Sequence, residues 1–468
     1  MAEIILSIFY ATLCLPFCIP FRQANPPTTR SPFLFLLLSN ILNLRPLPEN
    51  PSFSHHHPSN MSTSLSLSLL LLSFSLISLS FSVASAAVNS SIADLLSRRQ
   101  LRSGNLCDQL IIPNGYPCSE HSVETKDGFV LALQRVSSSH VIRLRRGPPV
   151  LLVHGLFMAG DAWFLNSREE SLGFILADHG FDVWVGNVRG TRWSHGHVSL
   201  SERAKAFWDW SWEDLALYDL AAMLELIYQE TDSKVFLVGH SQGTIMSLAA
   251  LTQPDILKRV EAAALLCPIS YLEHVNAPFV LRMANMYLDK MILAMGFHQL
   301  NFHSDIGIQL LDSVCDGHID CGDLLASITG GNCCLNISRV DFYFEYEPHP
   351  SSTKNLEHLF QMIRQGTFAK YDYGLLKNKR IYGSYKPPIF DLSLIPESLP
   401  LWMAYGGSDA LADAIDVQRT IKELPCKKEV LYLDAYGHVD FLIGVNAKED
   451  VYGHMIEFLN TWGISSSI

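Results

Sequence analysis

A serine flanked by glycines two residues away on either side is the feature that most restricts how this chain can fold. The pentapeptide Gly239-His240-Ser241-Gln242-Gly243 directly follows the apolar run 235–238 and precedes the small, helix-compatible run 244–251. A tight turn between a strand and a helix needs small neighbours, because larger side chains would collide. We therefore predict a sharp strand-to-helix turn that presents the Ser241 hydroxyl as a nucleophile, in preference to a purely structural turn.

The chain around this turn alternates apolar runs with helical patterns, which indicates a mostly parallel sheet with helices on both faces. Strands are predicted at 150–153, 182–185, 235–238, 401–405 and 430–433. A helix is predicted between the second and third strands, where apolar residues recur at helical spacing: Leu217, Leu220, Leu224, Ile227 and Tyr228. In such a sheet, functional side chains are expected in the loops beyond the carboxyl ends of the strands.

A serine hydroxyl needs an imidazole to take its proton and a carboxylate to orient that imidazole. Asp409 follows the strand 401–405 across Gly406-Gly407-Ser408, and His438 follows the strand 430–433. Both residues thus fall in the order serine, acid, base that this topology requires. We predict a Ser241, Asp409 and His438 triad. Asp413 and Asp416 are rivals for the acid, but we predict that they lie on the following helix and point elsewhere. His454 is a rival for the base, but it lies in a helix-like segment, where a surface or packing role is expected.

Backbone amides are the expected donors to the oxyanion that forms when such a serine attacks a carbonyl. One is predicted from Gln242, the residue after the nucleophile. The other is predicted from Leu156, just beyond the strand 150–153 and His154-Gly155. His154 itself precedes the serine in the chain, so we interpret it as structural.

Several short motifs follow one another in a fixed order over about residues 105–462. They are Tyr116-Pro117, Glu120-His121, Asp127-Gly128-Phe129, His154-Gly155-Leu156, Asn187-Val188-Arg189-Gly190, Phe207-Trp208-Asp209-Trp210-Ser211-Trp212, the pentapeptide followed by Thr244, Gly406-Gly407-Ser408-Asp409, and His438-Val439-Asp440-Phe441. This set resembles the acid lipase family, which comprises gastric and lysosomal lipases and plant triacylglycerol lipase relatives. The resemblance implies an α/β-hydrolase fold, with a mostly parallel central sheet, flanking helices and an inserted cap (lid) domain. It also implies hydrolysis of neutral-lipid esters, with the same triad and oxyanion positions.

The chain departs from this family at three places. Phe157 replaces a common leucine, Gly437 replaces a common asparagine before the base, and the cysteines from Cys315 to Cys334 look like an addition. The departures leave the chemistry intact and bear on acyl-chain preference.

The cap is predicted at about 272–394, where the alternation of strands and helices is interrupted. Its weakly charged run 277–297 carries four methionines: Met283, Met286, Met291 and Met295. This run is interpreted both as a buried helix and as an adaptable apolar wall for acyl chains. A membrane span is disfavoured, because Asn285, Asp289 and Lys290 would be costly in lipid.

The first 86 residues differ in composition from the rest. Residues 61–86 begin at a second methionine, continue as an apolar run and end in Ala84-Ser85-Ala86, as signal peptides do. Residues 1–60 are interpreted as a gene-model extension or a disordered leader, and their His55, His56 and His57 as a solvated run without metal. The hydrolase domain is then 87–468. A retained membrane anchor at 65–83 is the alternative reading.

Eight cysteines follow Ala86, an even number compatible with disulfides in a secreted chain. Spacing suggests a Cys107 to Cys118 pair and pairings among Cys315, Cys321, Cys333 and Cys334. Zinc is disfavoured because no Cys-x-x-Cys pair occurs. Asn89-Ser90-Ser91 and Asn336-Ile337-Ser338 are glycosylation sequons. We expect the secretory pathway, with an extracellular or a vacuolar or lysosomal destination.

A formal net charge of −12 and the lack of a basic cluster argue against nucleic acid as a partner. No cofactor or metal is expected. The expected partners are an apolar acyl ester and, transiently, a lipid–water interface. Two other functions use the same residues: acyl transfer to an alcohol, and non-catalytic binding of an apolar ligand.

Overall fold

The computed structural model describes residues 104–138, 147–302 and 321–463. The leader, the signal segment, the histidines at 55–57, the sequon at Asn89, and Cys315 lie outside these residues. No described helix combines the length and the apolar character needed to cross a membrane.

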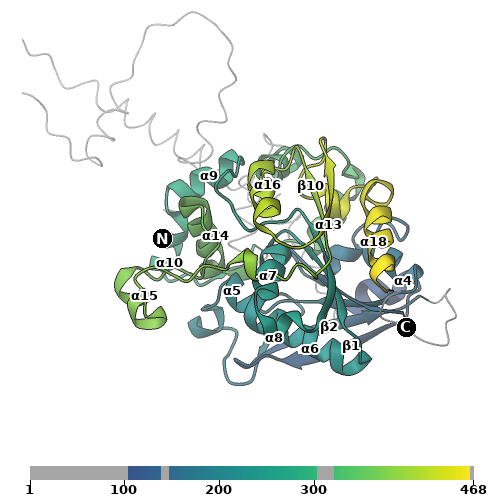
Figure 1. Ribbon diagram of the computed structural model, residues 1–468, viewed down its shortest axis with the longest axis horizontal. Coiled ribbons are helices and arrows are strands. Elements are labelled where there is room, and N and C mark those ends of the chain that lie inside the picture. The colour runs from purple at the N-terminus through teal and green to yellow at the C-terminus, as the bar shows by residue number, and fades with distance from the viewer. Residues whose placement is uncertain (1–103, 139–146, 303–320, 464–468) are drawn as a thin grey trace, which may run out of the picture. The chain divides into compact units, whose positions relative to one another are not determined.

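A nine-stranded sheet forms the centre of the described chain (Figure 1). Its order is β1 (Cys118–Glu124), β2 (Phe129–Val136), β4 (Asp182–Gly186), β3 (Pro149–Val153), β6 (Val235–His240), β7 (Val260–Leu266), β10 (Leu401–Gly406) and β11 (Lys428–Leu433), with β5 (Gly196–His197) paired to β2. Pairing is parallel from β4 through β11 and antiparallel around β2. The carboxyl ends of six strands therefore meet at one edge, where the predicted site residues follow them.

The central strands are buried on both faces, which explains their uninterrupted apolar sequences. Every residue of β3, β4 and β6 is buried. β11 lies at the edge and alternates partly buried with exposed side chains. All five predicted strands are present. The sheet also contains β1, β2, β5 and β7, which were not predicted.

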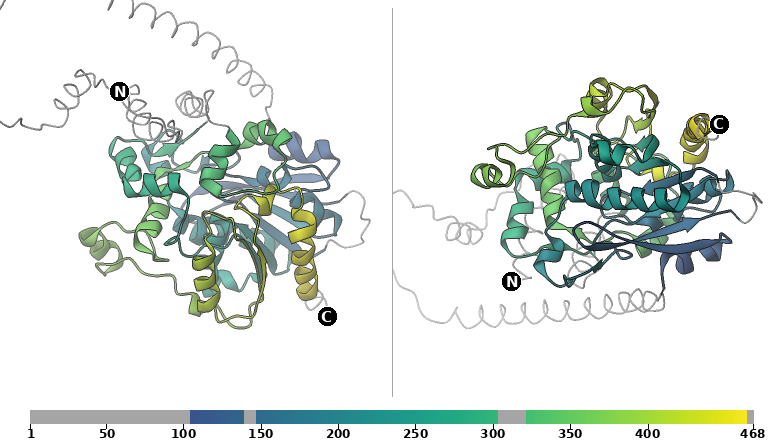
Figure 2. Two further views of the ribbon diagram at one scale, coloured as in Figure 1. Left: turned by 90° about the horizontal axis from the view of Figure 1, so that it is seen from above. Right: turned by 60° about the horizontal axis from the view of Figure 1, so that its bottom comes forward.

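Helices cover the sheet on both faces (Figures 1 and 2). On one face lie α4 (Leu172–Asp178) and α18 (Gly453–Gly463), and on the other α6 (Leu220–Thr231), α7 (Gln242–Leu251) and α16 (Ala414–Glu423). Shorter helices are η2 (Cys107–Ile111), η3 (Ile112–Asn114), η4 (Gly160–Phe164), η5 (Lys205–Trp208), α5 (Trp212–Asp214), η6 (Leu215–Asp219), α8 (Pro254–Leu257), α17 (Asp440–Ile443) and η9 (Lys448–Tyr452). The predicted helix around 217–228 is η6 continued by α6.

The chain between β7 and β10 forms a mainly helical insertion, which includes the 272–394 stretch. Its elements are α9 (Pro278–Asn285), α10 (Leu288–Ala294), β8 (Gln299–Leu300), α12 (Cys321–Thr329), η7 (Ile337–Arg339), α13 (Val340–Tyr346), β9 (Ser351–Ser352), α14 (Thr353–Gln365), α15 (Leu375–Tyr382) and η8 (Leu392–Leu394). β8 and β9 pair with each other and stay outside the central sheet.

The interpretation of 277–297 as a buried helix is wrong. The run is divided between α9 and α10, and the side chains of Met286, Met291 and Met295 are exposed. The buried member of α10 is Asp289, whose carboxylate pairs with Arg364 at 2.7 Å. The methionines therefore form a surface, because the polar side of α10 is the side that packs on α14.

Candidate active site

The serine turn has the sharp backbone that its sequence predicts. Ser241 joins β6 to α7 with φ 54° and ψ −120°, a conformation that non-glycine residues rarely adopt. A Cβ atom on Gly243 would lie 2.3 Å from the carbonyl oxygen of Val153, and one on Gly239 would lie 2.9 Å from the Gly243 backbone. The two glycines are therefore required by close backbone approach, and the strain at Ser241 is of the kind found at functional sites.

Asp409 and His438 come together beyond β10 and β11. The Nδ1 of His438 lies 2.8 Å from Oδ2 of Asp409, and both side chains are buried. Burial alone would raise the pKa of Asp409. The facing imidazole and the N–H groups of Leu411 and Ala412, which donate to Oδ1, instead hold this pKa below its ordinary value. The ionised carboxylate can therefore accept a hydrogen bond from the Nδ1–H of His438.

The base lies against the serine turn. Its ring centroid is 5.0 Å from that of His240, and the Nε2 of His240 donates to the carbonyl oxygen of His438 at 3.0 Å. The buried Nε2 of His438 has no hydrogen-bond partner among the described residues. With Nδ1 facing Asp409, this nitrogen is the one left to take a proton.

The predicted oxyanion residues adjoin Ser241. Gln242 is the first residue of α7, so its amide belongs to the N–H groups that have no acceptor within the helix. Leu156 follows β3, and a Cβ atom on the preceding Gly155 would lie 3.1 Å from the Cβ of Ser241. The loop that carries the Leu156 amide therefore packs directly on the serine.

The rival residues have other partners. Asp413 caps α16 by accepting from the amide of Ile415, and Asp416 accepts from both the amide and Nδ1 of His274. His154 is buried, which lowers its pKa to about 4, and its Nε2 accepts from the amide of Val188. His454 lies on α18. None of these is bonded to His438 in the described chain.

Cys267 is a site residue that the sequence reasoning missed. It directly follows β7, and its buried thiol donates to the carbonyl oxygen of His438 at 3.3 Å. Burial and the nearby Asp409 carboxylate raise the pKa of the thiol well above its ordinary value, so it stays protonated. Its place at the carboxyl end of a strand was the available signal, but β7 itself was not predicted.

A second missed group is a cluster of the buried Asp161 and His349 with the partly buried Glu347. The amide of Arg192 donates to Nδ1 of His349 at 3.2 Å, so the proton of the neutral ring is on Nε2, which donates to Asp161 at 2.9 Å. Burial and the adjacent Asp161 raise the pKa of Glu347 well above its ordinary value. The neutral form of Glu347 is therefore favoured beside the Asp161 carboxylate.

The cluster has the residue types of a metal site, and its ligand atoms lie within 4.8 Å of one another. The proton on Nε2 of His349 makes that nitrogen a donor, which argues against metal binding. Its position suggests another role. The amide of His349 donates to the carbonyl oxygen of Phe157 at 2.6 Å, so the cluster fastens the loop of Leu156 to the insertion.

The insertion also contacts the site at two other points. The carbonyl oxygen of Thr329 accepts from the amide of His438 at 3.0 Å. Asn355 on α14 donates from Nδ2 to Oε1 of Gln242 at 2.8 Å. These bonds tie the insertion to the base and to the residue after the nucleophile.

Two disulfides are present in the described chain. Cys107 pairs with Cys118, as spacing suggested, and Cys333 pairs with Cys334 within the cysteine cluster. The amides of Cys333 and Cys334 both donate to the carboxylate of Asp440, two residues after the base.

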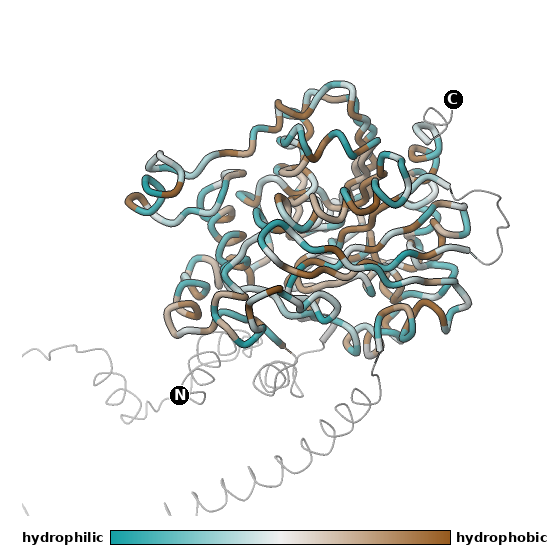
Figure 3. The backbone as a smooth tube through the Cα atoms, turned by 90° about the horizontal axis from the view of Figure 1, so that it is seen from below, coloured by the Kyte–Doolittle hydropathy of each residue, from teal (hydrophilic) through white to brown (hydrophobic). Residues whose placement is uncertain are grey.

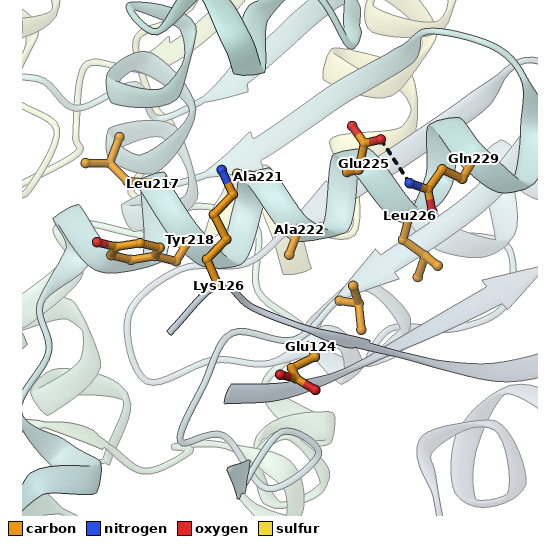
Figure 4. A pocket seen from close by; sticks show the side chains of 10 residues that line it. Glu124, Lys126, Leu217, Tyr218, Ala221, Ala222, Glu225, Leu226 and Gln229 are labelled. Atoms are coloured by element: carbon orange, nitrogen blue, oxygen red, sulfur yellow. Dashed lines mark hydrogen bonds between the residues drawn. The ribbon is translucent and has the colours of Figure 1, made fainter. Parts of the chain in front are cut away.

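A surface hollow lies away from this site, between α6 and the end of β1 (Figure 4). Its lining includes Glu225 and Gln229, which are hydrogen-bonded to each other at 3.0 Å. The lining contains no serine, cysteine or histidine, so we assign it no chemistry.

A strained serine between a parallel strand and a helix, with an Asp–His pair beside it, is the arrangement of the α/β hydrolases. Residues 148–445 match the family model described as "alpha/beta hydrolase fold", and residues 107–167 match "Partial alpha/beta-hydrolase lipase region".

Relatives extend the comparison over most of the chain. It is 65% identical to Triacylglycerol lipase 1 of Arabidopsis thaliana over 78% of this chain and 92% of that protein. It is 38% identical to Triacylglycerol lipase 2 of the same plant, over 76% and 88%, and 33% identical to Gastric triacylglycerol lipase of Rattus norvegicus, over 75% and 90%. The chain belongs to the acid lipase family of α/β hydrolases. It is an ester hydrolase of the lipase type, and the resemblance seen in the sequence is confirmed.

Proposed function

We propose that this protein hydrolyses neutral-lipid esters, either triacylglycerols or steryl esters, with Ser241, Asp409 and His438 as its catalytic residues. The observation that carries the proposal is the buried Asp409–His438 pair beside the strained serine. The 65% identity to Triacylglycerol lipase 1 of Arabidopsis thaliana supports the substrate class.

In the proposed reaction, Nε2 of His438 takes the hydroxyl proton as Ser241 Oγ attacks the ester carbonyl. The amides of Leu156 and Gln242 donate to the oxyanion that forms. His438 then gives the proton to the departing alcohol, and the acyl group stays on Ser241. Water, deprotonated by His438, attacks this acyl-enzyme, the bond between the acyl carbon and Ser241 Oγ breaks, and His438 returns the proton to Oγ as the fatty acid leaves. Asp409 remains ionised throughout and stabilises the imidazolium.

Ser241→Ala is the test of this assignment. Alanine is small enough for the turn, so the variant should fold normally and lose ester hydrolysis by a factor on the order of a million. Purified wild type and variant would be assayed on acyl esters of varied chain length, with circular dichroism as the folding control. Comparable turnover in the two proteins would overturn the proposed mechanism.

The same assay separates the competing functions. An acyltransferase would transfer the acyl group to an added alcohol in preference to water, which product analysis detects. A non-catalytic binder would retain affinity for an apolar ester without turnover in either protein.

We further propose that the 272–394 insertion acts as a cap over Ser241. A serine at the edge of a sheet is open to solvent unless another element covers it, and the insertion is bonded to both sides of the site through Thr329 and Asn355. Movement of part of this cap would admit a water-insoluble ester.

We also propose that the protein enters the secretory route and acts at a lipid–water interface. The Cys107–Cys118 disulfide supports the secretory route, because such bonds persist in oxidising compartments.

A further inference from the structure

Residues 374–390, called here the basic arm, leave the insertion after α14 and return to it. The arm contains α15, which projects from the rest of the described chain in Figures 1 and 2. Most of its side chains are exposed, and Asn378 and Phe390 are its buried members. This exposure means that little of the arm's surface is used for folding.

The charge of the basic arm is opposite to that of the whole protein. Its four charged side chains are all cationic: Lys377, Lys379, Arg380 and Lys386. It contains no aspartate or glutamate, whereas the full chain has a formal net charge of −12. A positive segment on a negative protein is a site of attraction for anions.

The same segment presents apolar side chains to solvent. The exposed fractions are 67% for Leu375, 82% for Leu376, 48% for Ile381, 57% for Tyr385 and 70% for Ile389. Apolar surface of this kind marks a site of association when it is contiguous. In Figure 3 the projecting arm alternates hydrophobic and hydrophilic segments over its short length.

Hydrogen bonds hold the basic arm in a defined conformation. Asn378 accepts from the amide of Tyr373 at 2.9 Å, and it donates to Asp372 Oδ1 at 2.7 Å and to the carbonyl oxygen of Tyr385 at 3.1 Å. The amide of Lys370 donates to the carbonyl oxygen of Pro388 at 2.8 Å, which closes the base of the arm. The leucines are therefore held outward by a fixed base.

A second apolar surface lies on the same side of the described chain. α10, with Met291 and Met295 exposed, packs on α14, and α15 lies on the same side of the described chain in Figures 1 and 2. Lys290 of α10 acts electrostatically on Asp372 at the base of the arm.

We propose that the basic arm docks on a lipid surface that carries anionic headgroups. Lys377, Lys379, Arg380 and Lys386 would meet the phosphate and carboxylate groups, while Leu375 and Leu376 would enter the apolar layer beneath them. An anionic lipid surface requires the two properties that the arm combines, cationic charge and protruding apolar side chains. This inference rests on the proposed function, because docking of the arm would hold the enzyme at the surface that contains its neutral-lipid substrate.

The test uses the purified full chain carrying Ser241→Ala, so that binding is measured without turnover. Co-sedimentation would compare vesicles of phosphatidylcholine alone with vesicles that also contain phosphatidylserine. Two arm variants would be added to this background, Lys379→Gln with Arg380→Gln, and Leu375→Ser with Leu376→Ser. The matched control is Lys234→Gln with Lys258→Gln, two exposed lysines that precede β6 and β7.

The unaltered arm should bind the anionic vesicles, and added salt should weaken this binding. Each arm variant should reduce the bound fraction about tenfold at limiting lipid, and the lysine control should match the unaltered arm. Equal binding by arm and control variants would overturn the proposal. Arm variants that leave vesicle binding intact but dissociate a dimer, measured by ultracentrifugation, would replace lipid with a second copy.

A second assay distinguishes failure of the lipid-docking proposal from failure of the proposed function. It measures hydrolysis of a short soluble ester by the enzyme with Ser241 intact. Loss of vesicle binding with normal soluble-ester hydrolysis would locate the failure in the arm. Absence of soluble-ester hydrolysis in the wild type would refute the proposed function and leave the vesicle result unaffected.

Discussion

At the scale of single residues, His438 is held by contacts from four separate segments. Its amide donates to Thr329, its carbonyl oxygen accepts from His240 and Cys267, and its ring meets Asp409. Three of these contacts fix the backbone and one fixes the ring. The orientation of the ring therefore depends on Asp409, whereas its position does not.

Replacing Asp409 should therefore affect the orientation of the His438 ring and not its position. Asp409→Asn is expected to lower kcat on a soluble ester by about 10⁴-fold, because an amide cannot hold the required tautomer or stabilise the imidazolium. Asp413→Asn is the matched control, since asparagine caps a helix as well as aspartate does. Its kcat should stay near the wild-type value. A similar loss in both variants would refute the assignment of Asp409.

The partly buried Glu347 gives a prediction about pH. Its raised pKa means that the neutral form is favoured in the folded protein, so its contribution to stability is full below the unfolded pKa. That contribution is lost as the pH rises through the raised folded value. Glu347→Gln keeps a neutral group of similar shape at every pH. Thermal unfolding from pH 4 upward should therefore show the variant gaining stability relative to wild type as the pH rises. A difference that does not change with pH would contradict the neutral assignment.

At the scale of elements, each strand that was predicted contains an uninterrupted run of at least three apolar residues. β7 was missed because its sequence is rich in alanine, which favours helix when read alone. β1 carries polar residues on a half-exposed edge, so it has no clear apolar run. Asp409 and His438 could be placed in sequence because each follows a recognisable strand. Cys267, Asp161 and His349 could not, since their contacts join segments far apart in the chain.

α10 provides the prediction at this scale. Met291→Glu with Met295→Glu places charge on its exposed face, which we propose belongs to the cap. Hydrolysis of an emulsified long-chain ester should fall about tenfold, while a short soluble ester should be cleaved normally. Ile415→Glu on α16 is the control, because Ile415 is exposed to a similar degree. Equal losses on the two substrates in the methionine variant would mean that α10 affects folding or catalysis in general.

At the scale of the whole molecule, two features of the described chain agree with the proposed secretory route. The Cys107–Cys118 disulfide lies where the described chain begins, and the sequon at Asn336 lies in the insertion. Asn336 accepts from both the amide and the hydroxyl of Ser338, and the intervening Ile337 is 83% exposed. A glycan at this position would extend into solvent.

Expression in a eukaryotic secretory host tests this reading. The purified protein should lose mass on glycosidase treatment, and Asn336→Gln should remove part of that loss. N-terminal sequencing should begin near Ala87. An unglycosylated product that retains Met61 would support a cytosolic or membrane-anchored form instead.

The hydrogen bond between Asn355 and Gln242 would restrict how the proposed cap can open. α14 is further held by Ser352, which donates to the carbonyl oxygen of Trp208, and by His358, which is bonded to Ser211. If the whole insertion swung away as one rigid body, it would pull on the segment that supplies the Gln242 amide. We therefore expect α14 to stay in place when the proposed cap opens, together with α9 and α10, because Arg364 of α14 is bonded to Ala284 and Asp289. Substrate entry would then leave the catalytic geometry undisturbed.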